Sequence, residues 1–512
     1  MAGIEPTKYF LDTLTLVNNT GEQFDIRNLL MECKIFESIT SNFLLGEIAI
    51  QDATDFINNA KIVGQESLRI RFRHPGAEHN DDIIDKVFRI YKVSGVGRAG
   101  HNTTMFKLNF CSPEFLHSKR VRISQAFSGS YSDIAGQIAR DHLGVRAVEE
   151  APETGWPKNE GPYWEVREPS SDDSGNVIIP NWTVNYAINW LCSKAQGKQN
   201  DSGIQDSFFF YETANGGYKL EPITSMLKTQ YLSGEEFSFS PAASVEGDDW
   251  NSPLSPGRRI LNYNMGRTAN VLEATIKGMF ASKQTTIDTH KKNYKERDYN
   301  YLEDFYAAQN KKVEELNARV EWGSPEAPGD IKHPLIWKEP DVVYNPSGEF
   351  YSEGGTPLNS DTLKNDVIEK NYDKTLGDFP NAHTILASKN SFVHDSEGIL
   401  KSVSEKGIED GVLQFRQAVK QLLKYHTMNV LISTRTDIQT GQMINLVIPP
   451  TRPAAKNLRQ NFLHSGKYLI TEIMWDLTLK QCKTNLKVIK DSYHNELEMY
   501  EADVDILREV ST

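Results

Sequence analysis

The sequence has few cysteines and no long apolar run. None of its four cysteines belongs to a C-x-x-C pair, and they stand at Cys33, Cys111, Cys192 and Cys482. Each falls inside an apolar strand or helix pattern, so we expect buried free thiols rather than disulfides or metal ligands. No stretch of about 18 apolar residues is present, so no membrane segment is expected. The N-terminus also lacks a secretory signal, which predicts a soluble protein made in a cytoplasm.

Motifs for catalysis and cofactor binding are also missing. The sequence contains no H-E-x-x-H, no G-x-S-x-G, no Walker loop and no EF-hand run. Residues 95–100 match the dinucleotide fingerprint G-x-G-x-x-G, but a strand pattern follows where a helix N-terminus would be needed. We therefore expect a flexible hairpin loop there. The sequence predicts no enzyme activity, no catalytic, cofactor-binding or metal-binding residues, and no cofactor.

Composition and length place only loose limits on the class of protein and the number of domains. The net charge is −13 with a pI near 5.5, which does not suggest that the whole protein binds nucleic acid. Apolar residues make up 38% of the chain, so much of the surface must be solvated or in contact with partners. The length of 512 residues allows about three or four domains.

Strand patterns are abundant near the C-terminus. Between Tyr425 and Ile489, four segments alternate apolar and polar residues with a period of two, as in an antiparallel meander. The segment directly before them has a helical repeat with one apolar stripe, made of Ile408, Val412, Phe415, Val419 and Leu422. A helix packed beside a small barrel or sandwich is therefore expected.

Residues 9–113 show the same kind of meander, with a short loop or helical turn at Asp55–Lys61. One segment places apolar residues on one face and Arg69, Arg71 and Arg73 on the other. Together with Arg89 and Lys92, these arginines form either a positive stripe that contacts phosphates or an acidic partner, or a solvated face with acidic residues opposite. The second reading is favoured. In the first reading, an acidic subunit contact is preferred over sequence-specific DNA binding, because aromatic stacking residues are absent from that face.

The middle of the chain changes character. Ser130 with Asp133 resembles a capping box and predicts a helix that ends at Gly144. A second helix is expected from residues 180–183, and a hairpin from two strands at 208–212 and 218–222. Further strands are expected at 236–240, 258–264 and 271–277. A helix is expected near residues 302–316 of a polar, partly Pro/Gly-rich stretch.

These patterns predict an α+β fold with two antiparallel β-barrel modules, an intervening α/β module and a long polar insert. The first barrel is expected at 1–113, and the α/β module at 114–223. The second barrel is expected in two parts, 224–289 and 411–490, around an insert at 290–410, with an acidic helix or tail at 491–512. The barrel cores are expected to include Leu68, Ile70, Phe72, Ile444 and Leu446.

This order of segments resembles the baseplate hub proteins of contractile-tailed bacteriophages of the T-even type. The resemblance covers about two-thirds of the chain. It is carried by the stretches Thr40–Asp52, Ile62–Ile70, Cys111–Ser130, Ile179–Thr183, Ile438–Ile444 and Tyr468–Ile470.

The resemblance implies two tail-tube-like barrels in each chain and a homotrimer whose six barrels form a pseudo-sixfold ring. Such a ring joins the tail tube protein to the central spike protein, contacts neighbouring baseplate proteins in the virion, and lines the channel through which genomic DNA passes without sequence-specific binding. The insert at 290–410 is longer than the family pattern requires. It leaves open a role in additional baseplate contacts.

Two other functions remain open at this point. One is a spike-base module of a phage-like secretion or injection apparatus, which shares the barrels. The other is a tail-associated peptidoglycan hydrolase whose catalytic carboxylates come from the 290–410 insert, because a glycosidase pair can be assembled from distant segments. Only genome context or the identity of the fused or bound spike separates the first of these from the hub, whereas a peptidoglycan-hydrolysis assay decides the second.

Overall fold

The computed structural model describes the chain in separate ranges. These are 5–77, 82–98, 103–147, 163–166, 176–195, 207–227, 236–239, 256–267, 270–288, 293–301, 350–351, 357–358, 380, 382–387, 390–394, 400–404, 412–448 and 464–490. The expected helix at 302–316 and the expected C-terminal helix or tail at 491–512 lie outside these ranges.

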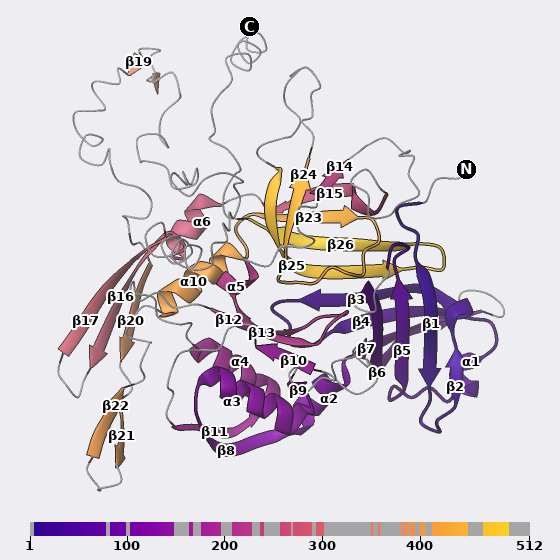
Figure 1. Ribbon diagram of the computed structural model, residues 1–512, viewed down its shortest axis with the longest axis horizontal. Coiled ribbons are helices and arrows are strands. Elements are labelled where there is room, and N and C mark those ends of the chain that lie inside the picture. Colours follow the sequence, from indigo (N-terminus) through magenta and orange to yellow (C-terminus); the bar gives the residue numbers. More distant parts are fainter. Residues whose placement is uncertain are drawn as a thin grey trace.

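The first seven strands form one half of a large sheet (Figure 1). In pairing order they are β2 (Gln23–Asp25), β1 (Phe10–Val17), β5 (Ser67–Arg73), β6 (Ile83–Arg98), β7 (Thr104–Cys111), β4 (Leu45–Asp52) and β3 (Leu30–Ser38). The short helices η1 (Arg27–Leu29) and α1 (Phe56–Asn59) interrupt them. We call these strands the first strand set. They confirm the predicted strands and the helical insertion, but the order is not a simple meander, because β1 pairs with β5 and β4 with β7.

Alternation of apolar and polar residues sets which face is buried. The side chains of Leu68, Ile70 and Phe72 are fully buried, while the arginines between them stay partly exposed. Because successive side chains in a strand point to opposite faces, this period fixes the core side of the sheet. The predicted core residues of both strand regions, Ile444 and Leu446 included, are buried in one continuous cluster.

Six later strands form the other half of the sheet. In pairing order they are β25 (Gly466–Leu477), β24 (Met443–Val447), β14 (Glu236–Phe239), β15 (Arg259–Arg267), β23 (Thr427–Ile432) and β26 (Cys482–Ile489). β26 pairs again with β25, so the pairings pass through all six strands and return to the first. These six strands are the second strand set.

The two strand sets share one 13-stranded sheet, because β3 pairs antiparallel with β25 from Cys33↔Leu477 to Ser38↔Glu472. The expectation of two separate barrels is therefore wrong. The first set is also open, since β2 and β3, its outer strands in the pairing order, do not pair with each other among the described residues. The edge of β3 is instead satisfied by β25, as an exposed row of N–H and C=O groups requires.

The α/β module lies beside the first strand set (Figure 1). The predicted capped helix, second helix and hairpin are confirmed as α3 (Tyr131–Ile138), α4 (Val184–Lys194), and β12 (Phe208–Glu212) with β13 (Tyr218–Pro222). Ser130 Oγ accepts a hydrogen bond from Asp133 N at 3.2 Å, and a π-helical turn carries the first of these helices on to Gly144. The remaining elements were not predicted: α2 (Pro113–Arg120), β8 (Arg122–Ser128), β9 (Arg146–Ala147), β10 (Tyr163–Val166), β11 (Asn176–Thr183) and α5 (Ile223–Met226).

One predicted strand is a helix. Residues 271–277 alternate like a strand, yet they form α6 (Val271–Ile276). Asn270 Oδ1 accepts a hydrogen bond from Glu273 N at 3.0 Å, which caps the helix N-terminus and outweighs a weak strand preference.

A small sheet projects from the main body (Figure 1), and its middle strand, at 281–288, belongs to the stretch predicted for the second barrel rather than to the insert. Its three strands are β17 (Asn293–Asn300), β16 (Ala281–Asp288) and β20 (Ala382–Ala387), in that order. Two short pairs follow, β18 (Phe350–Tyr351) with β19 (Pro357–Leu358), and β21 (Asn390–His394) with β22 (Leu400–Ser404). The predicted helix before the last strands is α10 (Val412–Leu422), which buries Phe415, Val419 and Leu422.

Candidate functional site: the joint between the strand sets

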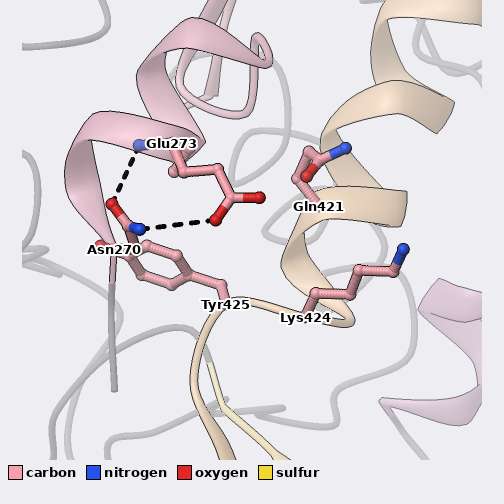
Figure 2. A pocket seen from close by; sticks show the side chains of 6 residues that line it. Asn270, Glu273, Gln421, Lys424 and Tyr425 are labelled. Atoms are coloured by element: carbon pink, nitrogen blue, oxygen red, sulfur yellow. Dashed lines mark hydrogen bonds between the residues drawn. The ribbon is translucent and has the colours of Figure 1, made fainter. Parts of the chain in front are cut away.

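A shallow hollow between α6 and α10 has no catalytic arrangement. Its lining includes Asn270, Glu273, Lys424 and Tyr425, and Figure 2 shows Asn270 turned back onto Glu273. The Glu273 carboxylate accepts from Asn270 Nδ2 at 3.4 Å and pairs with Lys277, so it serves the helix itself. Among the described residues, no cluster of three or more His, Cys, Asp or Glu side chains could hold a metal ion. No helix in the described part of the chain is long and apolar enough to cross a membrane.

The basic stripe on β5 is neutralised by acidic neighbours. Arg69 pairs with Asp85 at 3.0 Å, while Arg71 and Arg73 lie 3.6 and 3.4 Å from Asp12. Arg71 also lies 3.5 Å from Asp85. For the three arginines of β5, this confirms the reading of a face with acidic residues opposite. Arg89, also part of the predicted stripe, donates instead to Ser67 Oγ at 2.6 Å.

The glycine-rich match lies in a hairpin. Gly95–Arg98 belong to β6, where Gly97 pairs with Met105 and Arg98 with Thr104 of β7. The strand runs further than the sequence suggested, and no helix N-terminus follows in the described residues to hold a pyrophosphate.

The two strand sets have the same pairing order. The first runs β3-β4-β7-β6-β5-β1, and the second runs β15-β23-β26-β25-β24-β14. In each set the second to fifth of these strands come from four successive strands of the chain, β4 to β7 and β23 to β26. One difference is that β1 is antiparallel to β5, whereas β14 is parallel to β24. Another is that β3 and β4 are joined by residues 39–44, whereas residues 268–426 separate β15 from β23.

The equivalence extends to single ladder positions. The β3–β4 ladder has a bulge between Leu30 and Glu32, and the β15–β23 ladder has one at the equivalent position, between Ile260 and Asn262. A second matched pair lies in β6 between Ile90 and Lys92 and in β25 between Ile470 and Glu472. Two further register shifts, at Met265/Arg267 in β15 and Ser94/Gly97 in β6, have no counterpart among the described residues of the other set. A bulge changes the local twist and shifts the alternation of faces by one residue. Bulges at matching positions are therefore a strong sign of an internal repeat.

Core residues correspond at these matched positions. The ladders align the buried residues Ile48 with Val430, Leu108 with Leu486 and Ile70 with Leu446. On the opposite, polar face they align Lys34 with Asn264. Gly46 corresponds to Met428, and its cross-strand neighbour Phe110 corresponds to Val488. The large side chain of this pair thus lies on β7 in the first set and on β23 in the second.

The α/β module locks the joint between the sets with buried polar contacts. Glu37 of β3 is 1% exposed, and its carboxylate accepts from Thr440 N and Ala214 N at 2.7 Å each and from Thr440 Oγ1 at 2.8 Å. One side chain thus joins the second strand set to the turn of the β12–β13 hairpin. Burial raises the pKa of Glu37, and the hydrogen bonds from Thr440 and Ala214 oppose that shift.

A second group of contacts ties the hairpin to the first strand set. Glu212 accepts from Leu44 N at 3.1 Å and from Ser112 Oγ at 2.5 Å, and Lys86 Nζ lies 3.2 Å from its other oxygen. Tyr218 Oη lies 3.2 Å from both Glu212 Oε2 and Glu114 Oε2. Burial, and then the charge of Glu212, raise the pKa of Glu114 to about 7.

Further contacts reach the loop that precedes β24. His74 Nδ1 lies 2.7 Å from Thr436 Oγ1, and burial lowers the pKa of this histidine to about 4. Asn215 Nδ2 donates to Thr436 O at 3.0 Å, and Trp475 Nε1 donates to Arg435 O at 2.8 Å. The joint is therefore a structural contact, because its polar groups form hydrogen bonds that hold the modules together.

One face of the sheet is polar across both sets. Its charged residues form opposite pairs, Lys34 with Glu32 at 2.9 Å, Lys107 with Glu47 at 3.5 Å and Lys487 with Glu472 at 2.7 Å. Asparagines stand at neighbouring ladder positions on the same face, at Asn109, Asn485, Asn429 and Asn264. The face combines polar character with nearly balanced charge.

Sequence reasoning missed the joint entirely. Glu37 and Glu212 lie in ordinary strand patterns, and nothing local marks them as contacts with residues far away in the chain. The four cysteines, by contrast, are free and buried, as predicted.

No protein-family model matches the chain, and no curated protein matches it. Among solved structures, the tail protein from Neisseria meningitidis MC58 has a TM-score of 0.45 and 10% identity, over 94% of this chain and 97% of that chain. The 43 kDa tail protein of prophage MuSo2 from Shewanella oneidensis has a TM-score of 0.44 and 8% identity, over 94% and 98%. An Escherichia coli type VI secretion component, c3393, described as similar in structure to the T4 bacteriophage tail proteins gp27 and gp5, has a TM-score of 0.36 and 8% identity, over 96% and 78%. Over nearly its whole length, the chain is thus structurally similar to tail proteins, one of them from a prophage, and to a type VI secretion component.

Proposed function

We propose that this protein is a structural, non-enzymatic baseplate hub of a contractile phage tail. Three copies form a ring that joins the tail tube to the central spike in the virion. The observation that carries the proposal is the internal repeat of strand order and bulges. A threefold ring presents six nearly equivalent units only if each chain supplies two.

The unlike parts of the chain reduce the symmetry to three. The residues between β3 and β4 are few, whereas the equivalent span between β15 and β23 holds the projecting β17-β16-β20 sheet and α10. Each chain therefore has one plain unit and one unit with a large insertion. We assign contacts with the tail tube ring to the repeated units, and contacts with the spike and neighbouring baseplate proteins to the unlike parts.

The polar face of the sheet is suited to line a channel. Three of its lysines, Lys34, Lys107 and Lys487, are paired with carboxylates, which lowers the positive charge that a passing polyanion would meet. Asparagine side chains offer hydrogen bonds without net charge. We assign this face to the passage of genomic DNA, without sequence-specific contacts.

Light scattering on the purified protein tests the assembly. We expect a mass of about three times the 58.0 kDa chain at high protein concentration, and electron images with a central hole. A stable dimer as the highest assembly would contradict the ring. A peptidoglycan hydrolysis assay tests the non-enzymatic role, and activity that is lost when carboxylates in the 290–410 insert are replaced would overturn it.

A further inference from the structure

We infer that β15 of one copy pairs antiparallel with the outer half of β6 in the next copy, with Asn264 opposite Gly97. This rests on the proposed ring and names its contact between copies. The occupant of both edges is a second copy of this chain, because the same contact already exists once inside each chain, as the β3–β25 joint.

The internal joint shows how a long strand serves two neighbours on one side. β24 pairs with β25 at Gly466–Leu469, and β3 pairs with β25 at Glu472–Leu477, while β26 occupies the opposite side. The bulge after Ile470 marks the point where one neighbour gives way to the other. The outer half of β25 is thus the docking edge of the second strand set.

β6 repeats this design without the second neighbour. β5 pairs with β6 at Ile83–Arg89, and β7 occupies the opposite side through Arg98. Beyond the matching bulge after Ile90, no described strand lies along β6 on the β5 side. Val96 in this segment is 58% exposed, and two glycines, Gly95 and Gly97, leave room for another backbone to approach closely.

β15 is the matching edge in the second strand set. Its equivalent, β3, pairs with β4 on one side and with β25 on the other. β15 pairs with β23 along its length, but β14 reaches only Arg259 and Ile260 on the other side. No described strand continues along that side past Ile260. Asn262 and Asn264 beyond this point are exposed.

The register follows from the ladders. Lys34 lies opposite Asp476 in the internal joint. Lys34 corresponds to Asn264, since both follow their bulges by the same number of ladder steps. Asp476 corresponds to Gly97 through the β26 and β7 ladders. Transferring the joint to two copies therefore places Asn264 opposite Gly97. Applied three times, the contact closes a ring.

Oxidative cross-linking of the double variant Gly97→Cys with Asn264→Cys tests this register. A Cβ at Gly97 meets nothing within 4 Å, and Asn264 is exposed, so both changes leave the fold intact. Paired residues of antiparallel strands lie about 4.5–5.5 Å apart, which suits a disulfide. The four native cysteines are buried and do not compete. We expect covalent dimers and trimers on non-reducing gels, and no larger species.

Matched controls separate this contact from random collision. Asn429 is exposed and lies opposite Asn264 on β23, one strand or about 5 Å further from the edge. Gly97→Cys with Asn429→Cys is therefore expected to cross-link at least tenfold less. If the protein is trimeric by light scattering but the Gly97/Asn264 variant cross-links no more than this control, the proposed strand register is wrong and the proposed ring is retained. If the protein neither forms trimers nor cross-links at any concentration, the proposed function is wrong as well.

Discussion

Glu114 and Glu212 approach the same phenol from two parts of the fold, each with one carboxyl oxygen 3.2 Å from Tyr218 Oη. A phenol has one hydrogen and can donate to only one of them. Both contacts are satisfied when Glu114 carries a proton and donates it to the phenol oxygen, while the phenol donates to ionised Glu212. The junction between α2 and the β12–β13 hairpin therefore depends on one proton.

The first prediction concerns the pH dependence of stability. The pKa of Glu114 is about 7 in the folded protein, above its ordinary value of 4.5, so the folded state holds a proton that the unfolded state has lost between these values. The free energy of unfolding is thus expected to fall as pH rises from 4.5 to 7 and then to level off, with a total change of about 3 kcal/mol. Thermal unfolding between pH 5 and 8.5 measures this.

The matched variants for that experiment are Glu114→Gln and Glu47→Gln. The glutamine amide of the first variant keeps a donor for Tyr218 but has no proton to lose. The pH dependence of the unfolding free energy that comes from this site should therefore vanish. Glu47 pairs with Lys107 at a half-exposed position, and its replacement should leave the slope unchanged. An unchanged slope in Glu114→Gln would show that the proton resides elsewhere.

The second prediction concerns Glu37. Replacing it by alanine leaves Ala214 N, Thr440 N and Thr440 Oγ1 without their buried acceptor. Each buried unsatisfied donor costs about 1–3 kcal/mol, so we expect a loss of about 3–5 kcal/mol in the free energy of unfolding. Hydrogen exchange should accelerate in the hairpin turn at 213–217. Glu32→Ala on the exposed face of the same strand should cost less than 1 kcal/mol, and equal losses for the two variants would argue against the joint.

The third prediction compares two glycines with the same backbone conformation. Gly441 has φ +80° and Gly21 has φ +87°, so alanine at either position is strained by about 1–2 kcal/mol. A Cβ at Gly441 would also collide with the buried hydroxyl of Tyr211, whereas one at Gly21 meets nothing within 4 Å. Chemical denaturation of Gly441→Ala should therefore show a loss at least twice that of Gly21→Ala. Similar losses would mean that Tyr211 moves aside without cost.

The fourth prediction tests the internal repeat through packing. A Cβ at Gly46 would overlap the ring of Phe110 and would also collide with the backbone oxygen of Lys34. In the second strand set, Met428 and Val488 take the places of Gly46 and Phe110 and reverse their sizes. Gly46→Ala should cost about 1–3 kcal/mol through overpacking. Adding Phe110→Val removes the obstructing ring, so the double variant should lose less than the sum of the two single variants, by about 1 kcal/mol or more. Strict additivity in a double-mutant cycle would contradict direct contact.

Local signals predicted many elements well because their causes are local. Alternation of apolar and polar residues marks a strand wherever one face is buried, as at Leu68, Ile70 and Phe72. The hydroxyl of Ser130 predicted the start of α3 for a similar reason, since a cap acts over three residues. A local cap also explains why residues 271–277 were wrongly predicted as a strand. The hydrogen bond between Asn270 and Glu273 caps α6, although the alternation of residues there favoured a strand.

The sequence by itself determined most strands of the large sheet, the capped helix α3, the buried thiols and the presence of two similar regions, because each depends on neighbours along the chain or on simple periodicity. Only the tertiary structure decided that the regions share one sheet through β3 and β25, that their bulges match, and that Glu37 and Glu212 lock the joint. These features depend on backbone pairing between segments hundreds of residues apart. Pairing of this kind uses the same N–H and C=O groups at every residue, so side-chain identity hardly records it.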